Sequence, residues 1–578
     1  MFQYLVMTVM LLMALYTVYI GVKSRLFFLS VFSALQIGVV AWLFLFSGHP
    51  VIRHVNIHLD RLTLLMILII GLIGGLICIY SVGYMKEYHQ RNTQLKDCRF
   101  IFFSLLFLSI FTMIGLVVVS DLALMLLFLQ VLSLCSYFLI GYTRSISTKA
   151  KKTSFTVLTY NVFGDFCFAL GIVLLAVFEN VLDFYRLVLL DSYSPMVMSA
   201  ILLIALGGLV KAVQFPFSKW ILNAMEAPAP ALAMLHSVTM VNAGIYLILR
   251  LTPMLGSTAV GVSVTFVGGL TFIIAAALAG SQYDARKMLA YSTVSAMGLI
   301  VVCAGLNAPA SQWAAIMLLI LHSVAKSLLF LSFGSAAHQP GERDVEHMRG
   351  MHGMSMRLAM FLIIGMAGML VAPFVMLLSR WPAMQAIIVS GNILIVMIIA
   401  FGSTVTLFFW TKWIGKLIAH VHLYDREEKY PTRFNETFSL FALAACVLVV
   451  CMLYPLVSEL IVVPFIRDSM MVDYGVPILP EELSAIFLML AMLLVIPIIL
   501  IPYFKKHWVK RAPTYLAGIN TGDDLTYRGA MGQTRRYELR NRYLIPFLNE
   551  RKSLMIGYII CIVIIMVGFF VTMGGAIL

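Results

Sequence analysis

Side chains that can take up and release protons lie inside long apolar stretches of this sequence. The set comprises Asp165, Lys211, His236, His322 and Lys326. An ionisable group is costly within an apolar segment of membrane-spanning length and is therefore a functional candidate by default. Desolvation favours the neutral form of a buried lysine, whereas a carboxylate nearby favours its charged form. A lysine in such surroundings is suited to binding and releasing a proton in turn.

His322 and Lys326 lie four residues apart in LHSVAKSLLFLSFGS, so a helix places them on one face. Two cations on one face repel each other, and at least one of them should be neutral much of the time. A neutral histidine could then pass protons to a neutral lysine. Alternatives stay open for two other residues: His236 as a hydrogen-bonded packing residue, and Lys211 as a side chain that reaches the membrane surface.

Two apolar segments carry a proline close to a charged residue. In GGLVKAVQFPFSKW, Pro216 follows Lys211 by little more than one turn. Proline removes a backbone donor and clashes with the carbonyl four residues earlier, so a helix break is predicted there. Glu226 follows this break and is a further candidate acid. In GMAGMLVAPFVMLLSRW, Pro373 predicts a second break before Arg380. An arginine stays charged, so this one could gate or tune a site but could not release a proton.

The composition indicates what must position these residues. Of the 578 residues, 62% are hydrophobic and only 11% are charged, and apolar runs long enough to cross a bilayer recur along the chain. We predict an all-α polytopic transmembrane bundle of about sixteen helices. The predicted spans begin near Phe2, Leu26, Leu59, Phe100, Leu122, Ser154, Met196, Ala227, Ala259, Arg286, Gln312, Ser355, Ile388, Thr437, Glu482 and Ser553. The first stretch lacks the features of a cleavable signal and is interpreted as a span.

Lysine and arginine are concentrated in the loops after odd-numbered spans, whereas the loop at 459–482 is net acidic. The positive-inside rule then places the basic loops in the cytoplasm and both termini on the outer side of the cell membrane. The long polar stretch 505–552 carries eleven basic residues against four acidic ones, with several glycine turn signals. We predict a folded cytoplasmic loop that contacts a partner protein or anionic lipid headgroups.

The cysteines and the net charge exclude several kinds of site. None of the eight cysteines forms a CxxC pair, and no Cys/His cluster has metal-ligand spacing. We therefore expect no iron–sulfur, zinc or haem cofactor in this chain. The net charge of +14 is explained by the membrane loops, so we expect no nucleic-acid partner.

The two predicted breaks lie in the seventh and twelfth spans. An odd offset gives the two segments opposite orientations, which is typical of inverted-topology repeats with binding sites at broken helices. The alternative is that the prolines only kink ordinary membrane helices.

Several stretches together resemble the antiporter-like subunits of respiratory complex I, Mrp-type Na+/H+ antiporters and energy-converting hydrogenases. They are LDRLTLLM (59–66), YSVGYM (80–85), LCSYFLIGY (134–142), KAVQFPFSKWILNAMEAPAPALAMLHSVTMVNAGIYLI (211–248), RKMLAYSTVSAMG (286–298) and LHSVAKSLLFLSFGS (321–335). The resemblance implies two inverted five-helix repeats and a central polar axis that carries protons. It divides the chain into N-terminal helices (1–98), a first repeat (99–250), a second repeat (251–415), C-terminal helices (416–504), the basic loop (505–552) and a last helix (553–578).

The resemblance also implies roles for single residues. Lys211 corresponds to the family's lysine on the broken seventh helix, and Asp165 corresponds to its sixth-helix acid. His236, His322 and Lys326 correspond to its central proton relay.

Arg380 and Gln130 depart from the family's pattern. Arg380 stands where the long complex I subunit has a lysine and its shorter relatives have a glutamate. Gln130 replaces a fifth-helix glutamate that pairs, in the family, with the seventh-helix lysine. A glutamine carries no charge, so Lys211 needs another acid, for which Asp165 and Glu226 are the candidates. The departure also leaves open a scaffold that has lost transport.

Residues 512–544 resemble the loop before the last helix in the large membrane subunit of Ech-type energy-converting NiFe hydrogenases. This implies a proton- or Na+-translocating subunit of a ferredoxin-linked hydrogenase complex. Its partners would be other membrane subunits and a peripheral NiFe hydrogenase and iron–sulfur arm, which would hold the redox chemistry. The alternatives are a subunit of another complex I relative or of an Mrp-type cation/proton antiporter.

Overall fold

The computed structural model describes most of the chain. The described residues are 2–23, 27–46, 57–190, 193–256, 258–336, 345, 356–370, 375–418, 433–472, 474–475, 488, 492, 519–520, 526–536 and 548–574. The helices of the first half are α1 (Phe2–Lys23), α2 (Phe27–Phe46), α3 (Arg61–Arg91), α4 (Arg99–Val118), α5 (Leu122–Ile140), α6 (Thr148–Phe178), α7 (Phe184–Val188), α8 (Pro195–Lys211), α9 (Lys219–Asn223), α10 (Ala229–Ser237) and α11 (Met240–Leu255). Those that follow are α12 (Ala259–Ser281), α13 (Ala285–Gly305), α14 (Pro309–Ala336), α16 (Met356–Leu370), α17 (Val375–Val389), α18 (Ile393–Ile418), α19 (Phe434–Met452), α20 (Tyr454–Val457), α21 (Val463–Met470) and α24 (Glu550–Gly574).

Within the described residues, eleven helices are long and apolar enough to cross a membrane, with α10 and α11 taken together as one. Shorter apolar helices accompany them, including α8 and parts of α1, α2 and α16. The prediction of an all-α polytopic membrane bundle is confirmed. Each predicted span except the fifteenth overlaps a helix. The fifteenth, expected to begin at Glu482, lies outside the described residues apart from Leu488 and Met492.

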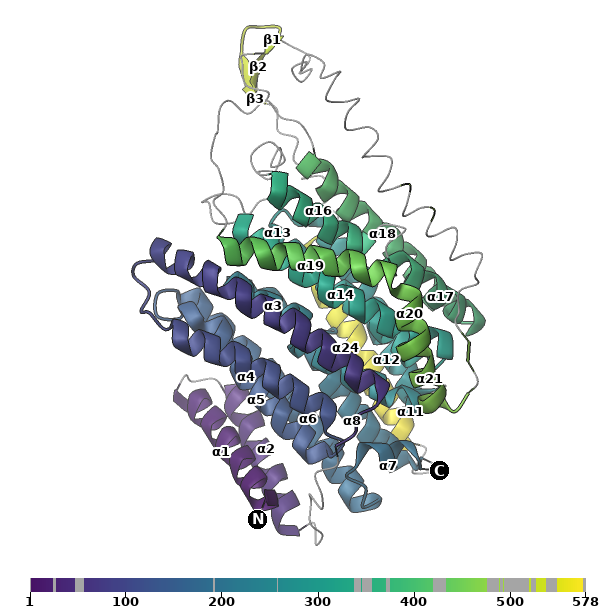
Figure 1. The fold of residues 1–578 in the computed structure, drawn as a ribbon. Coiled ribbons are helices and arrows are strands. Elements are labelled where there is room, and N and C mark those ends of the chain that lie inside the picture. Colours follow the sequence, from purple (N-terminus) through teal and green to yellow (C-terminus); the bar gives the residue numbers. More distant parts are fainter. Residues whose placement is uncertain are drawn as a thin grey trace.

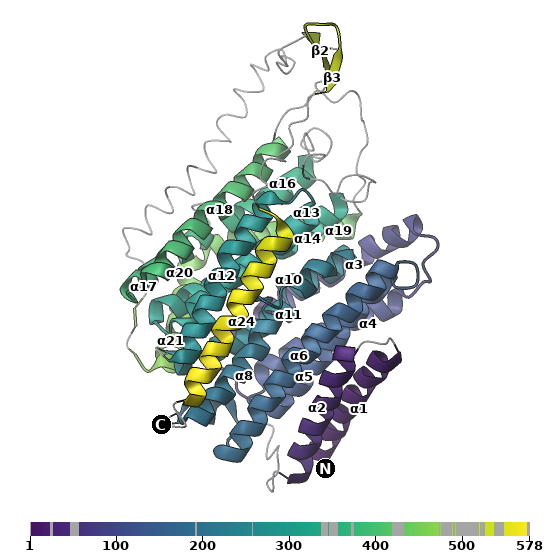
Figure 2. The same cartoon turned by 180° about the vertical axis from the view of Figure 1, so that it is seen from behind.

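The bundle is built around α14, which is buried along its whole length and packs against α10, α13, α16, α17 and α19. On one side of it, α6 packs against both α5 and α8, while α11 contacts both α8 and α13. Figure 1 shows α1 and α2 as a pair at one edge, where α2 packs on α6. Figure 2 shows α24 crossing the opposite face over α12 and α8. Polar residues on α14 are therefore shielded from lipid by surrounding helices.

The break predicted at Pro216 is present, although the helix ends before the proline is reached. α8 ends at Lys211, and two residues later Val213 adopts a φ of 65°. A β-branched residue in the left-handed region is locally strained. The indole N–H of Trp220 donates to the carbonyl of Val210 over 3.0 Å, so this interior helix end keeps hydrogen-bond partners.

Gly244 lets α11 approach this helix end closely. A Cβ atom on Gly244 would lie 2.3 Å from the backbone nitrogen of Ala212 and 2.5 Å from the carbonyl oxygen of Gly208. Any larger side chain would separate the two helices. The glycine therefore holds α11 directly against the last turn of α8.

The eighth span was expected to be one helix, but the structure divides it into α10 and α11. The break lies between Ser237 and Met240, where the sequence has neither proline nor glycine. The backbone N–H and the hydroxyl of Thr239 both donate to the carbonyl of Met234, over 3.0 and 3.1 Å. These bonds replace the regular helical pattern, as threonine hydroxyls can do. The interruption directly follows His236.

Two other expectations differ from the structure or lie outside it. The second predicted break, at Pro373, lies outside the described residues, between the end of α16 and the start of α17. Part of the loop expected at 459–482 is helical, because α21 and the π-helical turn η3 (Ser458–Val462) bury Val462, Val463 and Ile466.

The basic loop 505–552 contributes a small antiparallel sheet. Its strands are β1 (Ile519–Asn520), β2 (Thr526–Arg528) and β3 (Thr534–Arg536), in the order β1-β2-β3 (Figure 1). This sheet departs from the all-helical expectation. It follows the glycine turn signals, because Gly532 turns the chain between β2 and β3 with a φ of 73°.

Candidate functional site

Lys211 forms a buried ion pair with Asp165. The ammonium at the last residue of α8 lies 2.8 Å from the Asp165 carboxylate on α6, and only 1% of each side chain is exposed. Ser133 on α5 joins them, since Lys211 donates to its hydroxyl over 2.5 Å and the hydroxyl donates to Asp165 over 2.7 Å. Of the two acids considered for Lys211 from the sequence, Asp165 is its partner in the structure.

Glu226 does not reach this pair. It lies in the short 3-10 helix η2 (Ala224–Glu226) and makes an ion pair with Lys149, whose side chain is mostly exposed. The break after Lys211 leads the chain away from the pair before Glu226 is reached. Glu226, the other candidate acid for Lys211, therefore does not pair with it.

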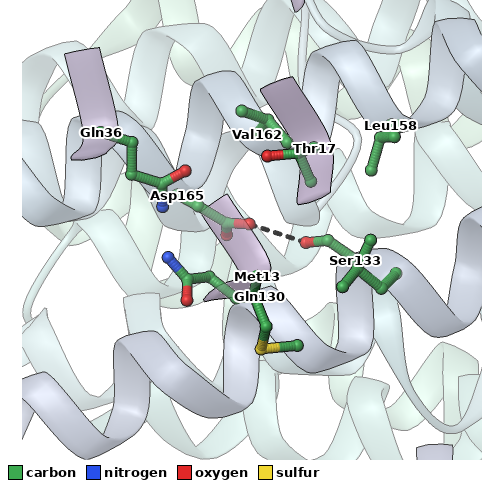
Figure 3. Close-up of a pocket in the computed structure, with 9 residues that line it drawn as sticks. Met13, Thr17, Gln36, Gln130, Ser133, Leu158, Val162 and Asp165 are labelled. Carbon is green, nitrogen blue, oxygen red and sulfur yellow. Dashed lines mark hydrogen bonds between the residues drawn. The ribbon is translucent and has the colours of Figure 1, made fainter. Parts of the chain in front are cut away.

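Gln130 lies beside the pair without joining it. It lines a small cavity of about 10 Å³ together with Asp165, Ser133, Thr17 and Gln36 (Figure 3). Gln130 is buried, and neither its amide nitrogen nor its amide oxygen has a hydrogen-bond partner among the described residues. Gln130 thus lies beside the carboxylate that holds Lys211.

His236 lies at the break between α10 and α11. Its Nδ1 is 3.3 Å from the hydroxyl of Thr293 on α13, and its ring packs on Phe330 with centroids 4.4 Å apart. Its Nε2 has no hydrogen-bond partner in the part of the chain that the structure describes. One ring nitrogen therefore stays available for proton exchange.

His322 contacts the carbonyl groups that the same break releases. Its Nε2 lies 3.4 Å from the carbonyl oxygen of His236. Asn242 on α11 donates to the carbonyl of Ser237 and to the hydroxyl of Ser323, each over 2.9 Å. The interrupted eighth span is therefore linked to α14 by polar side chains rather than by packing alone.

Lys326 follows His322 by one turn of α14 and is fully buried. Its ammonium donates to the carbonyl of Leu289 over 3.1 Å and to the hydroxyl of Ser292, both on α13, and lies 5.2 Å from the ring centroid of Trp410. No acidic side chain within the described part of the chain lies within ion-pair distance of it. A charged form is therefore supported only by neutral oxygens and an aromatic face.

Adjacent residues of α13 connect Lys326 with His236. Ser292 accepts from Lys326, and the next residue, Thr293, contacts His236. Arg380 lies apart from this chain of contacts, because its guanidinium donates to Thr406 on α18 over 3.0 Å. The structure thus forms two groups: the ion pair at the end of α8, and the two histidines with Lys326 around the break between α10 and α11.

Residues 119–406 match the family described as "NADH:quinone oxidoreductase/Mrp antiporter, TM". Residues 50–93 match "NADH-Ubiquinone oxidoreductase (complex I), chain 5 N-terminus". This chain is an antiporter-like membrane subunit of the complex I/Mrp family.

Individual proteins agree with this assignment. The Na(+)/H(+) antiporter subunit designated A1 of Staphylococcus aureus (strain JH9) is 32% identical over 443 residues, which cover 70% of this chain and 53% of that protein. The chain described here spans about half the length of the curated relatives that it matches.

Two solved structures share the fold. A chain of the Mrp complex from Dietzia sp. DQ12-45-1b superposes with a TM-score of 0.63 at 23% identity, covering 89% of this subunit and 58% of that chain. A chain of the membrane-bound sulfane sulfur reductase, an archaeal respiratory membrane complex, superposes with a TM-score of 0.65 at 19% identity. The match covers 81% of this subunit and 97% of that chain.

The antiporter-like subunit holds a second strong ion pair that the sequence analysis missed. Arg250 on α11 donates to both carboxylate oxygens of Asp60, the residue that caps α3. Burial opposes ionisation of Asp60, but the guanidinium and the capping bonds from Thr63 lower the pKa of Asp60 to about 2. The sequence contained a signal for this pair: an arginine at the end of the apolar run 240–250. A charge at such a position needs an oppositely charged partner, here a carboxylate.

A second missed residue is Glu436, in the first turn of α19. The subunit buries this carboxylate against Ser335 of α14, whose hydroxyl donates to it over 3.1 Å. The hydroxyl of Tyr80 lies 2.7 Å from that of Ser335. The expected span was placed from near Thr437, one residue later, and Glu436 was not singled out. It adds a buried acid to the surroundings of the helix that carries Lys326.

Proposed function

We propose that this chain is an ion-translocating membrane subunit of a multi-subunit complex of the Mrp/complex I type. The observation that carries the proposal is the buried pair of Lys211 and Asp165 at an interrupted helix. A buried charge pair adds little net stability over apolar packing of the same volume. Intramembrane ionisable residues at broken helices mark ion paths.

The pair can act as a switch for one proton. Lys211 holds its proton while Asp165 lies beside it, because the two charges compensate each other. When the carboxylate is neutralised or moves away, a lone buried ammonium costs roughly 3–5 kcal/mol. Moving one charge against about 100 mV costs about 2.3 kcal/mol. Rearrangement of one ion pair is therefore sufficient to drive one proton against a typical membrane potential.

The second group can receive the proton that Lys211 releases. His236 and His322 each have one ring nitrogen without a hydrogen-bond partner in the described residues, and Lys326 has no acidic partner there. Within the described part of the chain, no hydrogen bond joins Lys211 directly to His236. A proton crosses this interval when the Lys211 side chain leaves Asp165 and swings towards α11, which lies against the helix end.

We further propose cation/proton exchange as the activity of the assembly. The support is that the similar Staphylococcus aureus protein is named a Na(+)/H(+) antiporter subunit. The resemblance of residues 512–544 favours a hydrogenase-linked complex with a NiFe arm, but most of that segment lies outside the described residues. The exchange function is therefore the first choice and the hydrogenase-linked function the second.

The test uses the complex purified with its native partners and reconstituted into proteoliposomes with an internal pH-sensitive dye. An imposed Na+ gradient should drive a proton flux in the opposite direction, whereas an equal K+ gradient should not. If reduced ferredoxin drives the proton flux and H2 is released, the hydrogenase-linked function is supported and the exchange function is rejected. A complex that moves protons under neither condition would overturn the proposal.

A further inference from the structure

Asp165 also faces a polar cluster to which the N-terminal helices contribute. Thr17 of α1 and Gln36 of α2 line the same small cavity as Gln130, Ser133 and Asp165 (Figure 3). The exposed fraction is 2% for Gln36 and 5% for Gln130. In Figure 3 the Asp165 carboxylate is directed towards Ser133, and Gln36 and Gln130 are among the residues that line the same cavity.

Three amide atoms of this cluster lack hydrogen-bond partners among the described residues. They are the nitrogen and the oxygen of Gln130 and the nitrogen of Gln36. Leaving a buried polar group unsatisfied costs about 1–3 kcal/mol. Two such side chains around one carboxylate therefore indicate a site that is completed by a ligand. The cavity of about 10 Å³ has room for one particle about as large as a water molecule.

We propose that this cluster binds one Na+ ion. The cluster offers side-chain oxygens from a carboxylate, two amides and two hydroxyls, and hard cations prefer oxygen ligands. A glutamine can turn its amide to present either oxygen or nitrogen. The proposal rests on the proposed ion translocation and assigns a position to the cation that is exchanged.

The site couples Na+ to the proton on Lys211. Asp165 supplies a single negative charge, which the Lys211 ammonium neutralises at 2.8 Å. Na+ in the cavity would bring a second positive charge to the same carboxylate, so the two cations compete. A glutamate at position 130 would supply a second negative charge and remove the competition. The neutral Gln130 therefore makes Na+ binding favour loss of the Lys211 proton.

The test measures equilibrium binding of radioactive 22Na+ to the purified full-length chain in nanodiscs. We expect saturable binding of one ion per chain, displaced by Li+ but not by an equal concentration of K+. Gln36→Leu and Gln130→Leu should each weaken binding by about tenfold or more. Lys211→Met should strengthen it, because the competing ammonium is removed. Gln312→Leu is the matched control: this buried glutamine lies on α14, outside the cavity, and its loss should leave binding unchanged.

Absence of saturable binding in both the wild-type chain and Lys211→Met would overturn the site. Equal binding by Gln130→Leu and the wild type would do the same. If the complex exchanges ions but its chain does not bind Na+, the proposed translocation stands and the Na+ site is rejected. Binding by a chain whose complex moves no ion would retain the site and reject the translocation.

Discussion

Removing either charge of the pair Lys211–Asp165 should destabilise the protein more than removing both. Each side chain is 1% exposed, and the described residues offer no second acid to Lys211. Asp165→Asn and Lys211→Met should each lower the free energy of unfolding by about 3–5 kcal/mol, because one buried charge is left unpaired. The double variant removes both charges. Its loss of unfolding free energy should be smaller than the sum of the two single losses by about 2 kcal/mol or more.

The assay is reversible unfolding of the purified chain in mixed detergent micelles, followed by circular dichroism across the four proteins of the cycle. Single variants that stay within about 1 kcal/mol of the wild type, or effects that simply add, would refute the argument. Gln130→Glu in the Asp165→Asn background returns a carboxylate to the same cavity and should restore part of the stability and of the proton flux. Gln312→Glu in that background is the matched control and should restore neither.

Three further outcomes are expected. Glu226→Gln should change the free energy of unfolding by about 0–1 kcal/mol, because its ion pair is exposed, and a loss comparable to that of Asp165→Asn would contradict the assignment. Asp60 is held ionised by Arg250, with a pKa of about 2 against an ordinary value near 4. It should therefore contribute roughly 2 kcal/mol above about pH 4, lost as the pH falls towards 2. The pH profile of unfolding should lose this slope in Asp60→Asn. A single reporter cysteine at Gln533, an exposed residue in the turn between β2 and β3 of the basic loop, should react with an impermeant maleimide only after cells are opened. Labelling in intact cells would invert the predicted topology.

The spans were predictable because membrane helices leave long apolar runs in a sequence. The same physics made Lys211, Asp165, His236, His322 and Lys326 visible, since a charge within such a run stands out. The pairing of Lys211 with Asp165 could be proposed because Gln130, where the resemblance implies an acid, cannot supply a charge. A choice between Asp165 and Glu226 needed the structure, because it depends on where the chain runs after the α8 break.

Other features of the site could not be predicted from the sequence. The break between α10 and α11 carries no proline or glycine, and arises from hydrogen bonds of Thr239 that many threonines could make. Gln36 and Thr17 look like ordinary polar residues of N-terminal helices. The packing of α1 on α5 and of α2 on α6 brings them to Asp165. Such contacts depend on tertiary arrangement, which helical periodicity does not encode.

The most direct test of the translocation path is the proton flux of the reconstituted complex carrying Lys326→Ala. Lys326 donates only to Leu289 and Ser292 and has no acidic partner in the described residues, so its removal leaves no buried carboxylate unpaired. The complex should therefore assemble normally, with the same subunits and elution volume as the wild type. We predict that its cation-driven proton flux is abolished, while the exposed-lysine control Lys86→Ala retains the wild-type rate. A fully assembled Lys326→Ala complex that moves protons at the wild-type rate would contradict the account.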